Sequence, residues 1–386
     1  MIITMVTLSE YLEDVINECG GFGRFQLMMS IIILGGKLPI TWTIYAMTFA
    51  GATPNWWCSQ NNISRQHTNN TKQFKTCMAD NETKCNSFHF DSSMHTIVNQ
   101  YELVCDKDWI VACATTVQMT GLLVACLSMG HLSDFIGRKP VLFFSFFLCC
   151  SMNLVAYFSV SWQMFVVVRF FLGFAVGNYL TVFFPLLTEF MSNDKRPYIA
   201  GLPSWTIPAS MFGIVAYLLP NWANIHMLTS IVTLPFLFIP ESFRWLVSNK
   251  RYSSAEEIIK KMAKINGKPL PDLTKISEMS IEKAQKTYTL LDIVRYNYLL
   301  RNTILHSFML TCSYVYYAIG FGVKNLSGSL YLNIFLVSAV EIPGDLFAIF
   351  TSNRQHWKEM VGQYFLSVVW FKFFGCWKFA DGSKSN

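Results

Sequence analysis

The chain has 386 residues, of which 52% are hydrophobic and 14% are charged, whereas soluble domains carry about 25% charged residues. Its mean hydropathy is +0.34, so the composition argues against a soluble globular protein and for a membrane protein. The net charge of +6 lies mainly in loops and is accompanied by no basic-aromatic motif, so we expect no nucleic-acid partner.

Long apolar runs recur along the chain. A membrane-spanning helix needs about 20 mostly apolar residues to cross a hydrocarbon core about 30 Å thick. Eight runs meet this length. A ninth candidate run, 361–379, is weak because Lys372 and Lys378 interrupt it. The pattern predicts an all-α, multi-pass membrane protein that lies in the lipid bilayer. The predicted spans are 25–50, 109–129, 140–160, 163–188, 198–219, 222–240, 303–322 and 329–350.

Residues 1–24, before the first predicted span, are acidic. They contain Glu10, Glu13, Asp14 and Glu18. A cleavable signal peptide begins instead with positive charge followed by a short apolar run. We therefore expect no signal peptide here and predict a cytoplasmic N-terminal tail.

The segment 51–108 has the features of an extracellular loop. It contains three acceptor sequences for N-glycosylation and four cysteines. An even number of cysteines in an oxidising compartment predicts two disulfides, for which three pairings are open. The alternative is unmodified asparagines and free thiols. The asparagines are Asn62, Asn69 and Asn81, and the cysteines are Cys58, Cys77, Cys85 and Cys105.

The loop 130–140, between the second and third predicted spans, concentrates glycine and charge. It contains Asp134, Arg138 and Lys139 within a few residues of each other. A carboxylate at a helix end and a neighbouring guanidinium can pair in one conformation and separate in another, as a gate requires. The alternative is a cytoplasmic loop whose cations only anchor it.

Basic residues also predict the orientation, because lysine and arginine collect in cytoplasmic loops. They occur in the loops 131–140 and 189–197, and the segment 241–302 has twelve of them against seven acidic residues. The short loops near residues 160, 221 and 324 share one cation, Lys324. We therefore predict that the N-terminus and the 241–302 linker are cytoplasmic.

The linker itself predicts an amphipathic helix. Ser253 and Ser254 followed by glutamates are typical of a helix N-terminus, where hydroxyls cap free amides. Apolar residues recur with helical spacing from Ile258, and Asn266-Gly267 would end the helix. We expect the helix to lie under the bundle, with a basic face that either contacts anionic lipid or is solvated.

These motifs resemble two nested transporter families. The loop 130–140 resembles the G-x-L-[SA]-D-x-x-G-R-[KR] loop of major facilitator transporters, with Phe135 where arginine or lysine is usual. The cysteine-bearing loop, the stretch Pro240–Leu246 and Val340–Pro343 resemble solute carrier family 22, the organic cation, organic anion and carnitine transporters. Sugar porters share the first loop and the P-E-S-x-R-W motif, but not the cysteine-bearing loop or V-E-I-P.

The resemblance implies a fold of two six-helix halves around a central site. This chain would supply the complete first half and two spans of the second. It also implies transport of a small organic cation, anion or zwitterion such as carnitine, by alternating access in the plasma membrane. Residues 351–386 do not resemble the family. The alternative is therefore a truncated, non-transporting form that is degraded or regulates a full-length partner; a homo-oligomer is the other expected association.

Candidate gating residues combine the loop with charges at the ends of other predicted spans. Glu189, at the end of the fourth span, could pair with Arg138 or Arg196. Arg169 resembles a family arginine with a role in coupling or helix packing, and Gly173 would permit close helix approach. The full gating set is Gly130, Asp134, Gly137, Arg138, Lys139, Glu189, Arg196, Glu241 and Arg244.

Candidate substrate-cavity residues are polar or aromatic side chains inside spans, where ionisable groups are costly and suggest function. Lys37 could attract an anion or pair with a carboxylate, or be a local accident. Asn178 could form hydrogen bonds in a cavity. The full set is Lys37, Asn178, Tyr316, Tyr317, Glu341 and Asp345.

The last four of these residues suggest a cation site. Glu341 and Asp345 are four residues apart and share one helix face, where they could bind an organic cation or a proton. An ion pair with a neighbouring helix is the alternative. Tyr316 and Tyr317 could hold a cation against their rings, or simply pack in the bundle.

No enzyme motif is present in the sequence. It has no P-loop, no paired Cys-x-x-Cys zinc spacing and no nucleophile elbow, and its histidines are scattered. We therefore expect neither an enzyme nor a bound cofactor or metal.

Overall fold

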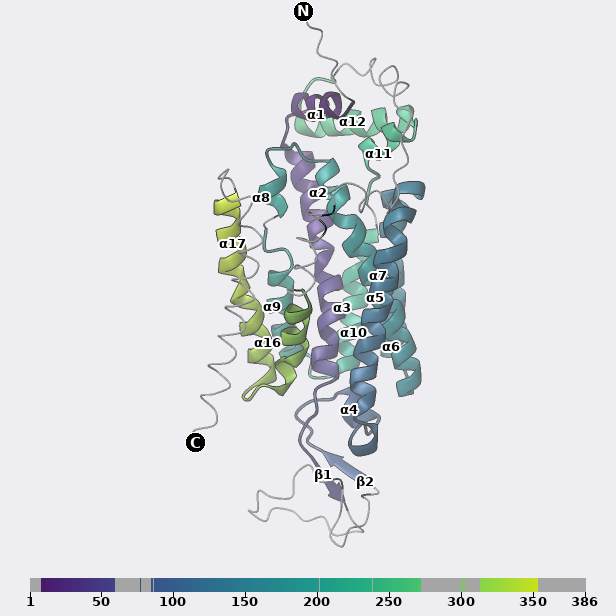
Figure 1. Ribbon diagram of the computed structural model, residues 1–386, viewed down its shortest axis with the longest axis vertical. Coiled ribbons are helices and arrows are strands. Elements are labelled where there is room, and N and C mark those ends of the chain that lie inside the picture. Colours follow the sequence, from purple (N-terminus) through teal and green to yellow (C-terminus); the bar gives the residue numbers. More distant parts are fainter. Residues whose placement is uncertain are drawn as a thin grey trace, which may run out of the picture.

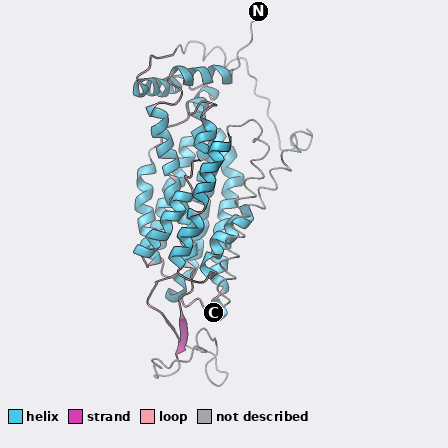
Figure 2. Ribbon diagram, turned by 90° about the vertical axis from the view of Figure 1, so that its left-hand side faces the viewer, coloured by secondary structure: helices cyan, strands magenta, loops and turns pink. Residues whose placement is uncertain are grey.

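The protein is an elongated helical bundle with a short hairpin at one end and horizontal helices at the other (Figure 1). The computed structural model describes residues 8–59, 77, 85, 87–200, 202–237, 239–271, 300, 303 and 313–352. The long helices run side by side in two perpendicular views (Figure 2).

The bundle is built from long apolar helices. Five helical stretches in the described residues are long and apolar enough to cross a membrane: Arg24–Ala50, Cys105–Ile136, Arg138–Tyr157, Trp162–Glu189 and Leu330–Phe347. The bundle helices are α2 (Arg24–Gly35), α3 (Lys37–Ala50), α5 (Trp109–Ile136), α6 (Arg138–Tyr157), α7 (Trp162–Glu189), α9 (Thr206–Leu218), α10 (Trp222–Thr233), α16 (Leu330–Ala339) and α17 (Glu341–Ser352).

Short elements connect these helices. Residues 313–322 form a further helical segment. They are the end of the predicted span 303–322, most of whose earlier residues lie outside the described residues. The connecting elements are α4 (Ile97–Gln100), α8 (Arg196–Ala200), α11 (Phe243–Ser248), η1 (Cys105–Lys107), η2 (Leu234–Leu237) and η3 (Val323–Asn325).

Two predicted spans are interrupted in the structure. The span 198–219 is divided into α8 and a shorter apolar helix that begins at Thr206. Pro203 lies between them, and proline lacks the amide that a continuous helix needs. The span 25–50 is divided at Gly36, where an added Cβ would lie 2.6 Å from the Phe146 ring.

Helices α5 and α7 make the closest contact in the bundle. A Cβ at Gly173 would lie 1.9 Å from the backbone oxygen of Gln118, and one at Gly121 would lie 2.1 Å from that of Phe170. Only glycine allows the two backbones to approach this closely.

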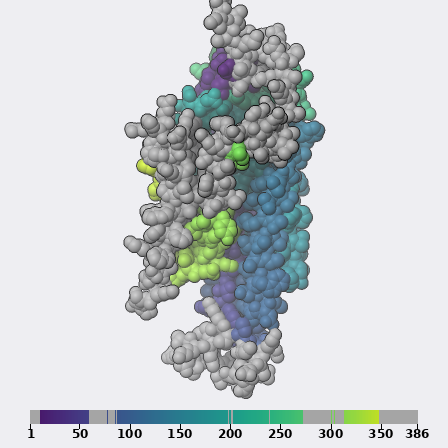
Figure 3. Space-filling view, in the orientation of Figure 1, coloured from purple at the N-terminus to yellow at the C-terminus, as the bar shows by residue number. Residues whose placement is uncertain are grey.

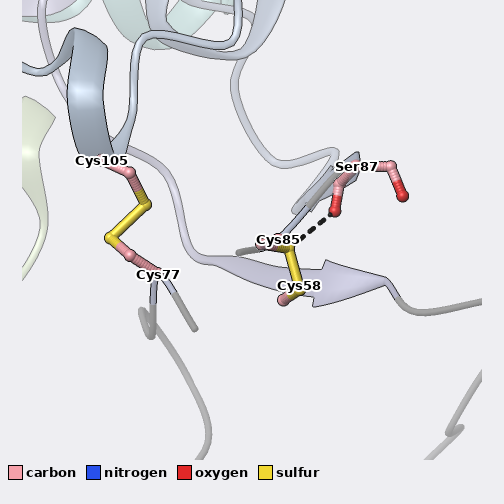
Figure 4. The surroundings of a disulfide bond; sticks show 5 residues. All are labelled: Cys58, Cys77, Cys85, Ser87 and Cys105. Atoms are coloured by element: carbon pink, nitrogen blue, oxygen red, sulfur yellow. Dashed lines mark hydrogen bonds between the residues drawn. A yellow bond between two sulfur atoms is a disulfide. The ribbon is translucent and has the colours of Figure 1, made fainter. Parts of the chain in front are cut away.

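The extracellular loop predicted from the sequence contains a two-stranded antiparallel sheet at its base. Strands β1 (Trp56–Ser59) and β2 (Ser87–Phe90) pair with Trp56 opposite Phe90. Of the three pairings open to its cysteines, the structure has Cys58–Cys85 and Cys77–Cys105 (Figure 4). The predicted glycosylation sites Asn62, Asn69 and Asn81 lie outside the described residues, as do residues 353–386 with the ninth candidate span.

Two helices lie across the opposite end of the bundle. Helix α12 (Tyr252–Asn266) ends, as predicted, before Gly267, whose φ of 66° is left-handed. It begins at Tyr252, and no side chain caps it, so the prediction of a serine cap was wrong: both serines already lie within the first turn.

Helix α1 (Leu8–Glu18) was not expected, because the sequence analysis treated residues 1–24 as a tail. Its apolar residues Leu12, Val15 and Ile16, together with Cys19, are buried. Their spacing of three and four residues matches one helix face, which therefore docks this helix onto the bundle.

Candidate functional site

A polar cluster joins helices from opposite ends of the chain. The Tyr316 hydroxyl donates to Oε2 of Glu341 at 3.3 Å and accepts from Nε1 of Trp205 at 2.9 Å. It also lies 3.3 Å from the Tyr45 hydroxyl. Tyr45 belongs to α3 and Glu341 begins α17, so folding brings together residues more than 270 positions apart.

The aromatic residues of this cluster come from three separate segments. Tyr45 and Glu341 are buried, and Tyr316 is partly buried. Tyr45 also packs near Phe212 of α9, with ring centroids 6.4 Å apart. The carboxylate of Glu341 therefore lies beside an aromatic group that contacts it through the Tyr316 hydroxyl, and aromatic rings can hold an organic cation.

A second carboxylate and an amine lie near the same helices. Nζ of Lys37 donates to Oγ of Ser204 at 2.7 Å and lies 4.5 Å from the ring centroid of Phe183. The Thr206 hydroxyl donates to Oδ2 of Asp345 at 2.9 Å. Ser204 and Thr206 flank Trp205 in the sequence, so these contacts adjoin those of Tyr316. We name Lys37, Tyr45, Trp205, Tyr316, Glu341 and Asp345 the central cluster.

Two predicted cavity residues are less closely tied to the central cluster. Tyr317 contacts Tyr316 edge-on, with centroids 5.5 Å apart, but stacks on Phe321. Asn178 is fully buried in α7, and within the described part of the chain its amide oxygen and nitrogen have no hydrogen-bond partner. Tyr45 and Trp205, by contrast, were missed, because single aromatic residues in apolar runs carry no distinguishing pattern.

Arg169 lies in a separate buried polar group inside the first half of the bundle. Its guanidinium donates to the backbone oxygen of Thr43 at 3.2 Å and to the side-chain oxygen of Gln118. Nearby, Nδ1 of His226 lies 2.7 Å from Oδ1 of Asn153. These contacts link α3, α5, α6, α7 and α10, which agrees with a packing role for Arg169.

A charged network occupies the end of the bundle that carries α1 and α12. Arg138 forms ion pairs with Asp134 at 2.8 Å and with Glu189 at 3.2 Å, and donates to the backbone oxygen of Ser133 at 2.9 Å. Of the two partners predicted for Glu189, the structure pairs it with Arg138. The side chains of Arg138 and Glu189 are only 13% and 18% exposed, so their attraction is weakly screened.

Glu241 binds the N-terminus of α6 in this network. Its carboxylate accepts from the backbone amides of Arg138, Lys139 and Ser242 at 2.9 to 3.2 Å. Negative charge stabilises the positive end of a helix dipole. Gly137 has a φ of 113°, and a Cβ there would lie 2.5 Å from Oε2 of Glu241, so the contact requires glycine.

Glu13 of α1 completes the network and was missed by the sequence analysis. Its Oε2 lies 2.6 Å from the guanidinium of Arg244 and 3.4 Å from that of Arg196. Burial and the neighbouring Arg244 lower the pKa of Arg196, while Glu13 and Glu189 act in the opposite direction. The apolar spacing in residues 8–19 is the signal that could have revealed this helix.

The remaining gating candidates lie at the edge of the network. Lys139 is exposed, and its backbone rather than its amine contacts Glu241. Gly130 lies in α5, where an added Cβ would make an ordinary contact with Thr181 at 3.5 Å. The network therefore consists of Glu13, Asp134, Arg138, Glu189, Arg196, Glu241 and Arg244.

Comparison with protein families matches residues 28–355 to the model described as "Sugar (and other) transporter". Among curated proteins, mouse "Solute carrier family 22 member 4" is 35% identical over 66% of this chain and 48% of its own length. Rat "Organic cation/carnitine transporter 2" is 33% identical over 68% of this chain and 49% of its own length. The chain thus spans about half the length of these curated relatives.

Solved structures confirm the predicted all-α major facilitator fold. The proton:xylose symporter XylE matches 86% of this chain with a TM-score of 0.59 at 14% identity, and the match covers 70% of that protein. A partially occluded inward-open form of XylE from E. coli matches 92% of this chain with a TM-score of 0.57 at 14% identity, over 82% of that protein.

Proposed function

This chain belongs to the sugar (and other) transporter family of the major facilitator superfamily, in solute carrier family 22, and on that premise we propose that it moves small organic cations or zwitterions across the plasma membrane. Because the chain spans about half the length of its curated relatives, the activity of the whole protein is part of this proposal.

The central cluster is the observation that supports a positively charged substrate. It contains two carboxylates, Glu341 and Asp345, against one amine, that of Lys37. Among the described residues of this cluster, carboxylates therefore outnumber amines. The Tyr316 hydroxyl contacts Glu341, and Tyr45 and Trp205 contact that hydroxyl in turn. An aromatic ring that faces a cation contributes about 0.5 to 2 kcal/mol. A quaternary ammonium would have a counter-ion in this site, next to aromatic side chains.

The mechanism that we propose is alternating access between the two halves. The first half contributes Lys37 and Tyr45, and the second contributes Tyr316, Glu341 and Asp345. A cation held between them would couple their movement, since a ligand shifts an equilibrium only by binding one state more tightly. The charged network would then act as a gate at the cytoplasmic end.

The orientation follows from the same proposal. The disulfide-bonded hairpin and the charged network occupy opposite ends of the bundle (Figure 1). Disulfides persist in oxidising compartments, and basic residues collect in the cytoplasm. We therefore place the hairpin outside the cell, and the N-terminus and α12 inside.

Uptake into proteoliposomes tests this function. We expect the purified full chain to take up radiolabelled tetraethylammonium or carnitine and to leave the anion para-aminohippurate outside. Glu341→Gln should reduce cation uptake at least about tenfold, because it removes a charged partner worth roughly 1.5 to 3 kcal/mol. Glu257→Gln, an exposed carboxylate of α12, is the matched control and should leave uptake unchanged.

Binding measured beside uptake separates the two functions considered for the chain. Binding of tetraethylammonium that depends on Glu341, without uptake, would favour a non-transporting form that acts with a partner. Preferential binding of para-aminohippurate, or binding that Glu341→Gln leaves intact, would contradict the cation site.

A further inference from the structure

An apolar groove of about 450 Å³ opens where α2, α6 and α12 meet. It is separate from the central cluster and shares none of its residues. Its lining combines side chains of α2, α6 and α12 with the end of η2 and the residues that follow it. The lining includes the apolar residues Phe25, Met28, Met29 and Phe143 and two lysines, Lys139 and Lys261.

The groove has an apolar floor and wall. Phe25 and Met29 are buried and form its base, whereas Met28 and Phe143 are partly exposed at its side. Next to it, the outward faces of α2 and α6 expose further large apolar side chains, such as Ile31 and Phe147. Such faces suit contact with lipid chains, and the groove lies on the same two helices.

Two lysines from separate elements line the same groove. Lys139 is the second residue of α6, and Lys261 lies on α12, which crosses the end of the bundle (Figure 1). Both are exposed, and no carboxylate of the described ranges forms an ion pair with either amine. The neighbouring Lys260, by contrast, is paired with Glu256 at 2.7 Å.

We propose that this groove binds one anionic glycerophospholipid. An acyl chain occupies the apolar part, and the ammonium groups of Lys139 and Lys261 hold the phosphate and the anionic headgroup at the level of α12. A groove that is apolar in its depth and doubly cationic at its edge complements an amphiphile with the same division. The proposal relies on the proposed function only for the leaflet, which is the cytoplasmic one.

The bound lipid would connect α6 and α12 at this end of the bundle. Lys139 adjoins Arg138 of the charged network, and its backbone amide binds Glu241. Helix α12 contacts α2 through Asn266, whose Oδ1 accepts from the amide of Phe25 at 2.9 Å. A lipid that bridges α6 and α12 would therefore hold α12 against the network.

Native mass spectrometry of the purified full chain tests the lipid directly. The chain is exposed to equal amounts of phosphatidylserine and phosphatidylcholine in detergent, and the retained lipid is counted per chain. We expect one phosphatidylserine to be retained in preference. Lys261→Gln should weaken its retention about fivefold, the factor that one lysine near an anionic surface provides.

Three further variants test whether the result is specific to the groove. Lys264→Gln removes an exposed lysine of α12 that does not line the groove and should leave retention unchanged. Met28→Trp should fill the groove and reduce retention of both lipids, whereas Leu27→Trp, its exposed neighbour outside the lining, should not.

Several outcomes would overturn the proposal. Equal losses with Lys261→Gln and Lys264→Gln would indicate a diffuse basic face, and unchanged retention with Met28→Trp would exclude the acyl chain. Displacement of phosphatidylserine by millimolar inorganic phosphate would indicate an anion site that needs no lipid. None of these readouts depends on transport, so failure of the carrier function leaves the lipid test intact.

Discussion

Glu13 is the residue through which α1 engages the rest of the protein. Its carboxylate lies between the guanidinium groups of Arg196 and Arg244, and its side chain is 14% exposed. A partly buried carboxylate between two cations stabilises all three groups, because each would otherwise be desolvated without a partner.

Glu13→Gln should therefore loosen α1. We expect the free energy of unfolding to fall by about 1 to 3 kcal/mol, because two charge-assisted contacts are lost. Hydrogen exchange over residues 8–19 and thermal unfolding in detergent measure the effect. Asp14→Asn, which removes an exposed carboxylate of the same helix, is the control. Equal behaviour of the two variants would show that Glu13 does not hold α1.

Cys19, at the end of α1, makes the docking of this helix sensitive to pH. Burial, and to a lesser extent the charge of Glu18, raise the pKa of the Cys19 thiol from 9.0 to about 11. The docked helix therefore favours the protonated thiol. The resulting stabilisation is complete below pH 9 and is lost as the pH rises toward 11.

This prediction is measured by alkylation with N-ethylmaleimide and by thermal unfolding between pH 7.5 and 11. Alkylation of Cys19 in the folded chain should be slow at pH 7.5 and should accelerate in Glu13→Gln, where α1 undocks. Cys19→Ala should remove part of the loss of stability between pH 9 and 11. An identical pH profile in wild type and Cys19→Ala would contradict the assignment.

At the scale of elements, the α5–α7 crossing depends on residues without side chains. The backbone oxygen of Gln118 occupies the position that a Cβ of Gly173 would need, at 1.9 Å. The two helices can accommodate a methyl group there only by moving apart, which breaks contacts along both of them.

Gly173→Ala should destabilise the chain by about 1 to 3 kcal/mol, within the usual range for overpacking. Gly130→Ala is the control, since its Cβ would lie 3.5 Å from Thr181 on the same pair of helices. Thermal unfolding in detergent distinguishes the variants. A Gly173→Ala chain as stable as Gly130→Ala would mean that the helices are less closely packed than described.

The sequence predicted most helices but not their interruptions. A run of about 20 apolar residues in a bilayer must be helical, because helices satisfy their own backbone hydrogen bonds. The first span is divided at Gly36, where the ring of Phe146 from another helix leaves no room for a side chain, and hydropathy does not reveal that contact. Lys37 follows Gly36 as the first residue of α3, and its amine donates to Ser204.

At the scale of the whole molecule, the charged network and the central cluster lie at different levels of one bundle. The face in Figure 3 presents α5 in blue beside the helices of residues 313–352 in yellow-green. Helix α5 belongs to the first half and residues 313–352 to the second half, and the proposed mechanism moves these halves against each other. The network lies within the first half and the segment that follows it. Its ion pairs join α5, α6 and α7 at one end, and a hydrogen bond from Arg244 to the backbone oxygen of Glu189 joins α7 to α11.

Arg138→Gln should destabilise the state in which the charged network closes the cytoplasmic end of the bundle. Losing the ion pairs to Asp134 and Glu189 removes about 1 to 3 kcal/mol from the state that contains them, which shifts a two-state equilibrium at least about fivefold. In a background without free cysteines, Ser204→Cys beside Lys37 reports access from the cytoplasmic side through its rate of labelling.

We expect a labelling rate at least about fivefold higher in Arg138→Gln. Lys264→Gln, which removes an exposed charge of α12 outside the ion pairs and outside the groove, should leave the rate unchanged. A rate that is insensitive to Arg138→Gln would mean that the network stabilises the fold without gating it.

The sequence by itself determined the all-α membrane fold and the family, because apolar length and local motifs are properties of consecutive residues. The tertiary structure alone decided which distant residues meet. Glu13 and Arg244 are 231 positions apart, and Tyr45 and Tyr316 are 271 apart. It also decided the pairing of four cysteines among three alternatives. Contacts of this kind depend on how helices pack against each other, and packing joins surfaces whose partners no local pattern specifies.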